Sequence, residues 1–406
     1  MGGKAILLLV AGFSVIFLVL GQNFNRVSNN SATNYSSYYA HNMSHNIAVS
    51  GANLAVNQIF LTPSWTTGYS NVSMSGGTMS ATVILINPVT NAIRITATGI
   101  YYGDTSTVIV NLQQSYFSKF AYCSNSENGV WWANQDTVNG PFHTQDYLNV
   151  NGHPVFNPGT NYVGTYKGIN KYNSSSSPII NGNLRVGDNL TIPSTGVSTL
   201  EALSTSGGHT FTGHDTVFLA FAGDSIRYKY AYNNSWTSAK TSTFAPNGTI
   251  VADNAILRIQ GTLTGKLTVG ASYTSKGGNV YIDDDVVYTT DPRINSSSTD
   301  LLGIVAQNNV YVADNPNTAN VHIDAAIYAQ SGGFGAQNYN TRAKSGYIYL
   351  LGGITQNGRL AVGTLDSYGN LSTGFSKNYT YDNRLLVNVP PNFPSTGSYE
   401  VISWFE

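Results

Sequence analysis

Three adjacent acidic residues, Asp283, Asp284 and Asp285, interrupt the segment GNVYIDDDVVY at residues 278–288. Carboxylates at this density suit two kinds of chemistry. A pair held about 5–9 Å apart can hydrolyse a glycosidic bond, and several together can bind Ca²⁺. Neighbouring residues on a strand point to opposite faces. Only Asp283 and Asp285 are therefore candidates for a catalytic pair, whereas all three are candidates for a calcium site.

A third interpretation is structural. The acids follow Ile282 and precede Val286 and Val287, so they fall where two short strands would meet. Carboxylates at such corners accept hydrogen bonds from backbone N–H groups and close the turn. The segment itself contains no His or Arg that would complete a hydrolase or lyase site. We favour corner acids and keep catalysis and calcium binding as alternatives; no other cofactor is suggested.

The histidines suggest no clear metal or catalytic site. His41 and His45 lie four residues apart, a spacing that places both on one helix face, but no third ligand accompanies them. His209, His214 and Asp215 in GGHTFTGHD fit a polar loop. The chain also lacks the G-x-S-x-G, Walker A, H-E-x-x-H and C-x-x-C patterns. We therefore expect a protein without enzymatic activity, with a polysaccharide hydrolase or lyase as the alternative.

The composition favours an exported β protein. Charged residues make up 10% of the chain and the formal net charge is −1, so no basic surface is available for nucleic acid. A hydrophobic content of 41% is enough to bury a core, and Gly, Tyr and Phe are abundant, as in strands and turns. The single cysteine, Cys123, excludes an intramolecular disulfide.

The first 21 residues form a leader or transmembrane segment. Ala5 to Leu20 is uncharged and apolar. As a helix it would span roughly 24 Å, slightly less than a hydrocarbon core of about 30 Å. One interpretation is a signal peptide cut after Gly21. Another is an uncleaved anchor with Lys4 in the cytoplasm.

A long helix is expected to follow this segment. Residues 22–60 contain no Pro, and Tyr35, Tyr39, Met43 and Ile47 recur every four residues, followed by Leu54, Ala55 and Ile59. This spacing predicts one apolar stripe on a helix. Residues 79–116 then alternate in the manner of an antiparallel meander, with Ile93, Ile95 and Ala97 on one face. We assign residues 22–120 to one domain made of this helix and meander.

The rest of the chain repeats short strands between Gly and Asn turns. The predicted inward residues are the pairs Val280 and Ile282, Val310 and Val312, Val321 and Ile323, and Ile348 and Leu350. Such repeats suit stacked strands, so we predict a right-handed parallel β-helix over residues 121–380, with an insertion near 195–245. A β-sandwich is the alternative. Residues 381–406 are predicted to cap the open end, with Trp404 as its plug.

The N-terminus resembles those of type IV pilins and of minor pilins of the PilX type. The match consists of GGK followed by an apolar run and a long polar helix, and IRITATGIYYGDTSTVIVNL is similar to the meander of those proteins. The resemblance implies peptidase cleavage between Gly3 and Lys4, although Leu8 stands where pilins carry a glutamate. Three further segments resemble a family of bacterial exported proteins with a pilin-like helix and a repetitive β domain. They are GPFHTQDYLNVNGHPVF, AAIYAQSGGFGAQNY and YEVISWFE. That family implies no catalytic residues.

These features predict an inner-membrane-anchored or pilus-associated protein of structural or adhesive role, with its β domain in the periplasm or at the cell surface. The N-terminal helix would contact lipid or pilin subunits, and the β domain a surface glycan or another cell. A carbohydrate-binding or carbohydrate-cleaving β-helix is the alternative. For that role the segment GVWWANQD, with Trp131 and Trp132, offers aromatic side chains that can stack on sugars.

Overall fold

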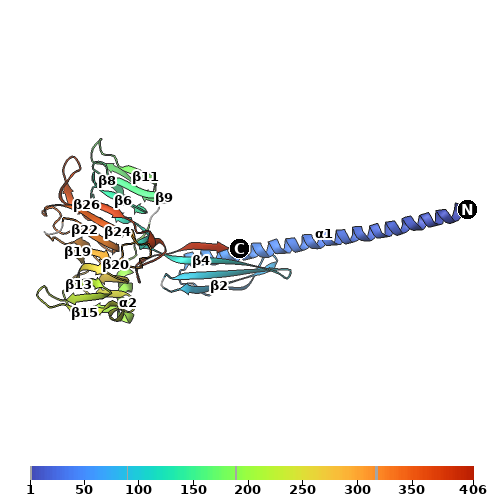
Figure 1. Cartoon of the computed structure of the whole chain (residues 1–406), viewed down its shortest axis with the longest axis horizontal. Helices are drawn as coiled ribbons and strands as arrows, with labels where there is room; N and C mark the ends of the chain where they lie inside the picture. The colour runs from blue at the N-terminus through green and yellow to red at the C-terminus, as the bar shows by residue number, and fades with distance from the viewer. Residues whose placement is uncertain (1, 89, 188–189, 316–318) are drawn as a thin grey trace. The chain divides into compact units, whose positions relative to one another are not determined.

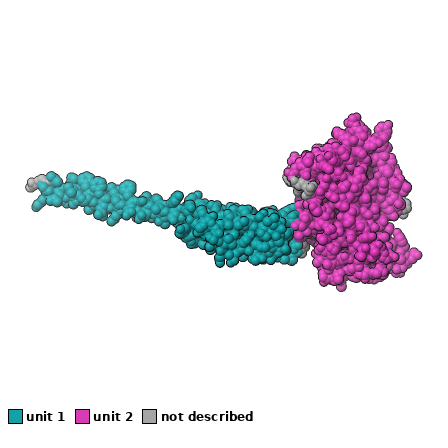
Figure 2. Space-filling view, turned by 180° about the vertical axis from the view of Figure 1, so that it is seen from behind, with its two compact units in different colours: residues 1–113, 398–406 teal, residues 114–397 magenta. Residues whose placement is uncertain are grey.

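The computed structural model describes residues 2–88, 90–187, 190–315 and 319–406. The chain divides into two compact units, coloured separately in Figure 2. Unit 1 comprises residues 1–113 and 398–406, and unit 2 comprises residues 114–397. Apart from one long helix at the N-terminus, the regular structure is mainly β (Figure 1). This confirms the predicted class.

Unit 1 is built on helix α1 (Gly2–Leu61). Its first third exposes large apolar side chains such as Leu8 and Phe17. Its last third buries one stripe of residues, namely Ser44, Ile47, Ala48, Gly51, Ala52, Ala55, Val56 and Ile59. The spacing of three and four residues is that of a single helix face. The predicted helix is therefore confirmed, and one face of it packs against a sheet.

The stripe itself was only partly predicted. Ile47, Ala55 and Ile59 are buried as expected, whereas Tyr35 and Leu54 are exposed. Small residues take the buried positions instead because the helix and sheet approach closely. A Cβ added at Gly99 of the sheet would lie 2.6 Å from the backbone nitrogen of Ala48. Close packing of backbones, rather than large aromatic contacts, joins these two elements.

The sheet of unit 1 has five strands in the order β1-β2-β3-β4-β27. Its strands are β1 (Tyr69–Met74), β2 (Gly77–Asn87), β3 (Ala92–Tyr101), β4 (Asp104–Tyr116) and β27 (Ser395–Phe405). The first four pair antiparallel, which confirms the predicted meander. Ile93, Ile95 and Ala97 are buried together with the helix stripe, as expected.

The last strand differs from the expectation of a cap over residues 381–406. β27 joins the edge of the unit 1 sheet beside β4. Trp404 packs against the core formed by the helix and this sheet. The alternating pattern of YEVISWF suits a sheet edge as well as a terminal plug, so the pattern alone does not identify the neighbour.

Unit 2 is one large mixed sheet in which parallel pairing dominates, together with a small sheet of β8 and β10. Its strands are β5 (Tyr122–Ser126), β6 (Thr137–Asn139), β7 (Phe142–Thr144), β8 (Tyr147–Val150), β9 (Val155–Tyr166), β10 (Gly168–Lys171), β11 (Ile179–Val186), β12 (His209–Phe211), β13 (Thr216–Gly223), β14 (Ser225–Lys229), β15 (Thr237–Lys240), β16 (Thr249–Ala252), β17 (Ile256–Leu263), β18 (Lys266–Ala271), β19 (Val280–Tyr288), β20 (Leu301–Ala306), β21 (Val310–Val312), β22 (Val321–Ala329), β23 (Phe334–Ala336), β24 (Lys344–Gly358), β25 (Gly363–Leu365) and β26 (Leu371–Thr380). The short helices are α2 (Gly196–Gly207), α3 (Thr241–Phe244), and the 3₁₀ turns η1 (Phe117–Lys119) and η2 (Asn383–Leu386).

Two long rows of parallel strands organise this sheet. The first row runs β12-β16-β18-β20-β22-β24-β5-β7. The second runs β13-β17-β19-β22-β24-β26-β6-β9-β11. Figure 1 shows β13, β19, β22, β26 and β11 following one another along unit 2. Strands β22 and β24 are long enough to contribute to both rows.

All eight predicted inward residues are buried, with at most 2% of each side chain exposed. Their registers also explain the uneven spacing of the repeats. Val280 pairs with Val310, and Val321 pairs with Ile348. Val310 and Val321 therefore belong to different pairings, although they lie close in sequence.

The rows do not follow chain order throughout. Ile354 of β24 pairs with Tyr122 of β5, and Asn378 of β26 pairs with Thr137 of β6. Strands from the two ends of the unit 2 segment are thus neighbours within both rows. We call these two pairings the junction. The junction joins two segments that lie more than 200 residues apart in the chain.

A buried ion pair lies at the junction. Glu127, just after β5, is fully buried, and Arg359, just after β24, is 3% exposed. Their side chains meet at 2.9 Å. The Glu127 carboxylate also accepts hydrogen bonds from Tyr122 (2.8 Å), Thr144 (3.0 Å) and the Trp132 indole (3.2 Å). Because both of its oxygens are satisfied, the charge can stay in the core.

We predict that Glu127→Ala strongly destabilises unit 2. The substitution leaves the Arg359 guanidinium buried without its carboxylate, a change that costs about 3–5 kcal/mol. The measurement is denaturant unfolding of the detergent-solubilised full chain. Asp224→Ala is the matched control, because it removes an exposed ion pair with Lys240 and should leave the unfolding midpoint unchanged. Equal effects of the two variants would contradict a special role for the junction.

Candidate functional site

The three predicted acids lie on strand β19 and have different partners. Asp283 forms an ion pair with Arg258 at 2.6 Å, and both side chains are largely buried. Burial raises the pKa of Asp283, an effect that the Arg258 guanidinium opposes. Asp283 and Arg258 also line a small pocket of about 160 Å³ with Phe218, Tyr232 and Trp236.

The side chains of Asp284 and Asp285 accept hydrogen bonds from backbone N–H groups. Asp284 accepts a hydrogen bond from the backbone N–H of Asp285 (2.8 Å). Asp285 accepts one from the backbone N–H of His322 (2.7 Å) and lies 3.4 Å from its ring nitrogen. Within the described ranges, no group of three or more His, Cys, Asp or Glu side chains is placed to hold a metal ion. The geometry thus gives each acid a structural contact, while the catalytic and calcium hypotheses stay predictions.

The histidines have neighbours of other kinds. His41 contacts Asp104 at 3.2 Å and His45 contacts Glu406 at 3.4 Å, both within unit 1. In unit 2, His209 stacks on Phe244 and His214 stacks on Tyr230. Asp215, the third member of the GGHTFTGHD group, pairs with Lys276 instead.

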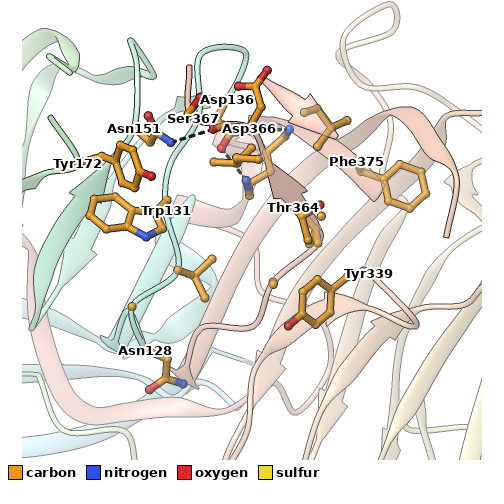
Figure 3. Close-up of a pocket in the computed structure, with 18 residues that line it drawn as sticks. Asn128, Trp131, Asp136, Asn151, Tyr172, Tyr339, Thr364, Asp366, Ser367 and Phe375 are labelled. Atoms are coloured by element: carbon orange, nitrogen blue, oxygen red, sulfur yellow. Dashed lines mark hydrogen bonds and ion pairs between the residues drawn. The ribbon is translucent and has the colours of Figure 1, made fainter. Parts of the chain in front are cut away.

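A pocket larger than the one beside Asp283 lies elsewhere in unit 2. It has a volume of about 410 Å³, within the usual range of roughly 300–1,000 Å³ for small-molecule sites. Loops after β5, β8, β10, β23 and β24 form its wall together with residues of β25 and β26, and Figure 3 shows the side chains that line it. The lining residues are Asn128, Gly129, Val130, Trp131, Asp136, Asn151, Tyr172, Tyr339, Ala361, Val362, Gly363, Thr364, Leu365, Asp366, Ser367, Leu371, Phe375 and Lys377.

Aromatic rings form two sides of this pocket. Trp131 and Tyr172 lie together on one side in Figure 3, and Tyr339 and Phe375 lie on the other. Trp131 and Tyr172 meet edge to face, with ring centroids 5.4 Å apart. Trp131 is partly exposed, whereas its neighbour Trp132 is fully buried at the junction. Of the predicted tryptophan pair, one therefore faces the pocket and the other supports the core.

Polar groups complete the wall between the aromatic sides. Asn151 is 3% exposed, and its amide NH₂ donates to the backbone oxygen of Asp366 at 3.4 Å. Its side-chain oxygen has no hydrogen-bond partner among the described residues. A buried acceptor without a partner is costly. A ligand that donates a hydrogen bond at this point would satisfy it.

The carboxylate of Asp366 sits in the tight turn that joins β25 to β26. It accepts hydrogen bonds from the backbone N–H groups of Asn370 and Tyr368, both at 2.9 Å. These donors lower the pKa of Asp366, so the group stays ionised at neutral pH. The turn therefore presents a negative charge at the pocket.

A second buried ion pair lies beside the pocket. The Lys377 ammonium is 2.5 Å from a carboxylate oxygen of Asp136, and both side chains are buried. Burial lowers the pKa of Lys377, an effect that the negative charge of Asp136 opposes. The two charges compensate each other, so this side of the pocket carries no net charge.

Sequence analysis identified only the Trp131 segment of this site. Asn151, Tyr339, Asp366 and Lys377 were missed because they belong to segments that come together only at and beside the junction, and Asp136, the last residue of the Trp131 segment, was given no role. The turn sequence DSYGN around Asp366 contains turn residues, but nothing in it indicates its neighbours in space.

Comparisons with known proteins add little. No protein-family model matches the chain, and no curated protein matches it significantly. Among solved structures, the chain is similar to the crystal structure of the competence-associated pilin ComZ from Thermus thermophilus. That match has 12% sequence identity and a TM-score of 0.36, and it covers 90% of this chain and 97% of the other. Similarity at this level does not carry function from one protein to the other.

Proposed function

We propose that this chain is an exported surface protein without catalytic activity, held in a membrane or in a pilin filament by α1. The supporting observation is the first third of that helix, where a window of mean hydropathy 2.5 has none of its residues buried. Leu7, Leu8 and Phe17 are 72%, 75% and 69% exposed to solvent unless lipid or another helix covers them. Burying one such side chain contributes about 1.5–3 kcal/mol, so this segment requires an apolar partner.

The proposed cellular location follows from the anchoring of the protein by α1. The protein would reside in the inner membrane with units 1 and 2 exported to the periplasm, or it would be carried to the cell surface with a pilus. In both cases α1 contacts lipid or pilin subunits, and unit 2 is presented to the outside. Its role is structural or adhesive.

Unit 2 suits presentation if it is a right-handed parallel β-helix. The dominance of parallel pairing supports this architecture over a β-sandwich, whose sheets are antiparallel. Strands that stack on their neighbours bury the inward residues continuously, while loops of any length remain outside. Those loops are where the 410 Å³ pocket is formed.

We predict that charges in the apolar segment release the protein from membranes. In Leu9→Asp combined with Phe17→Asp, each Asp costs about 3 kcal/mol in a spanning helix. The protein should move from the membrane fraction to the soluble fraction. Tyr35→Asp combined with Tyr38→Asp is the matched control, because these exposed residues lie on the same helix beyond the apolar run. Retention of both variants in the membrane fraction would refute the anchor.

The amino terminus of the exported protein provides a separate test. We expect the apolar segment to be retained, so mass spectrometry should find a terminus at Met1 for an uncleaved anchor or at Lys4 for pilin-type processing. A terminus at Gln22 would mean that a signal peptide is removed. That result would exclude both the anchor and assembly into a filament.

A second function, binding of a neutral saccharide, is favoured by the pocket in unit 2. Aromatic rings stack on the C–H faces of sugars, and Trp131, Tyr172 and Tyr339 supply such rings. A sugar hydroxyl can donate to the unpartnered oxygen of Asn151. Since the Asp136–Lys377 pair is neutral as a whole and Asp366 is negative, the pocket disfavours acidic sugars.

We predict that Tyr172→Ala weakens saccharide binding about five- to tenfold, because it removes one aromatic contact worth roughly 1–1.4 kcal/mol. Binding would be measured on a panel of immobilised neutral and acidic oligosaccharides. Tyr273→Ala is the matched control: Tyr273 is 44% exposed, compared with 51% for Tyr172, and it lies away from the pocket. Equal binding by the two variants would argue against this site. Shortened oligosaccharides after incubation would contradict the absence of catalysis.

A further inference from the structure

The ion pair of Lys377 and Asp136 has an unusual environment. Both side chains are buried, with exposed fractions of 7% and 0%. Fully buried Phe375 and largely buried Tyr379 flank Lys377 on strand β26. The Lys377 ammonium also lies 5.6 Å from the ring centroid of Trp132. An amine and a carboxylate are therefore held together with little exposure to solvent, near the buried charges of Arg359 and Glu127.

The strands fix the two groups opposite each other. Asn378 pairs with Thr137 in the parallel ladder of β26 and β6, so Lys377 and Asp136 precede paired residues. The Lys377 nitrogen lies 2.5 Å from Oδ2 of Asp136. The backbone N–H of Lys377 donates to the other carboxylate oxygen, Oδ1, at 3.0 Å. The backbone N–H of Ala133 donates to Oδ2 at 2.8 Å.

We propose that Lys377 and Asp136 form an intramolecular amide bond across the junction. The reaction needs no oxidant, reductant or added group. One ammonium and one carboxylate become one amide and one water molecule. This modification is independent of how the protein is anchored and of what its pocket binds.

The atoms balance in three steps. First, the Lys377 ammonium gives one proton to Oδ2 of Asp136, leaving a neutral amine and a neutral carboxylic acid. Second, the amine lone pair forms a bond to Cγ of Asp136, and the negative charge develops on Oδ1. Third, the bond from Cγ to Oδ2 breaks, and Oδ2 leaves with its own proton and a second amine proton as water.

Backbone donors are placed to assist these steps. The N–H group of Lys377 points at Oδ1, where the negative charge develops, in the manner of an oxyanion hole. The lowered pKa of Lys377, caused by burial, increases the fraction of neutral amine. Both residues also line the 410 Å³ pocket, which offers the released water a way out.

Two other Lys–Asp pairs provide internal comparisons. Lys276 contacts Asp215 and Lys240 contacts Asp224, but more than half of each of these four side chains is exposed. Water screens exposed pairs of this kind, and holding them in one geometry costs side-chain entropy, so their amines are not fixed against Cγ. The proposal predicts amide formation at Lys377 and not at Lys276 or Lys240.

The test is mass spectrometry of the purified wild-type full chain after denaturation and tryptic digestion. We expect a branched peptide that joins the Asp136 and Lys377 segments and is one water molecule lighter than their sum. Trypsin should not cleave after Lys377, because an amidated lysine is not recognised, but it should cleave after Lys276. Recovery of both segments as linear peptides of unmodified mass would overturn the proposal.

A pair of variants extends the test. Lys377→Arg keeps the positive charge, but its guanidinium does not form the amide, whereas Lys276→Arg changes an exposed pair. Under denaturing electrophoresis the linked wild-type chain and Lys276→Arg should migrate alike and faster than Lys377→Arg. Equal migration of all three would count against the bond. The wild-type peptide map decides the question even if Lys377→Arg does not fold.

Discussion

Unit 2 depends on the pairing of strands that lie at opposite ends of its chain segment. Backbone hydrogen bonds alone do not select β5 and β6 as the neighbours of β24 and β26, because any exposed parallel edge offers the same donors and acceptors. The side chains supply the selection. Glu127 and Asp136 come from the early chain segment at the junction, and Arg359 and Lys377 come from the late one. A shifted register would leave these charges buried without partners, an arrangement that is strongly unfavourable.

The junction also accounts for the position of the pocket. Trp131 and Asn151 come from the early strands, and Tyr339, Asp366 and Phe375 come from the late ones. These two groups of residues share a wall only when the two chain segments are paired. The Trp131–Trp132 dipeptide shows the connection directly: Trp132 donates to Glu127 in the core, and its neighbour Trp131 faces the pocket. Any binding function of the pocket therefore requires an intact junction.

Local patterns predicted the elements well and their neighbours poorly. The absence of Pro predicted the long helix, and alternation predicted Val280, Ile282, Val321 and Ile323 as buried residues, all confirmed. Alternation describes one strand, however, and not the strand beside it. The last strand was therefore expected to cap the repeats, whereas it joins the sheet of unit 1. The pocket was missed for the same reason, because contacts between β24 or β26 and β5 or β6 leave no periodic signal in the sequence.

Helix α1 shows how one element meets two different environments. Its first third carries large aliphatic side chains, which gain most from transfer out of water. Its last third places Ser44, Ala48, Gly51 and Ala52 against the sheet, where small side chains allow close approach: a Cβ at Gly51 would lie only 2.5 Å from Met79. Large residues in this region would push the sheet away. The change of residue size along a single helix thus separates an exposed apolar segment from a segment that packs against the sheet of unit 1.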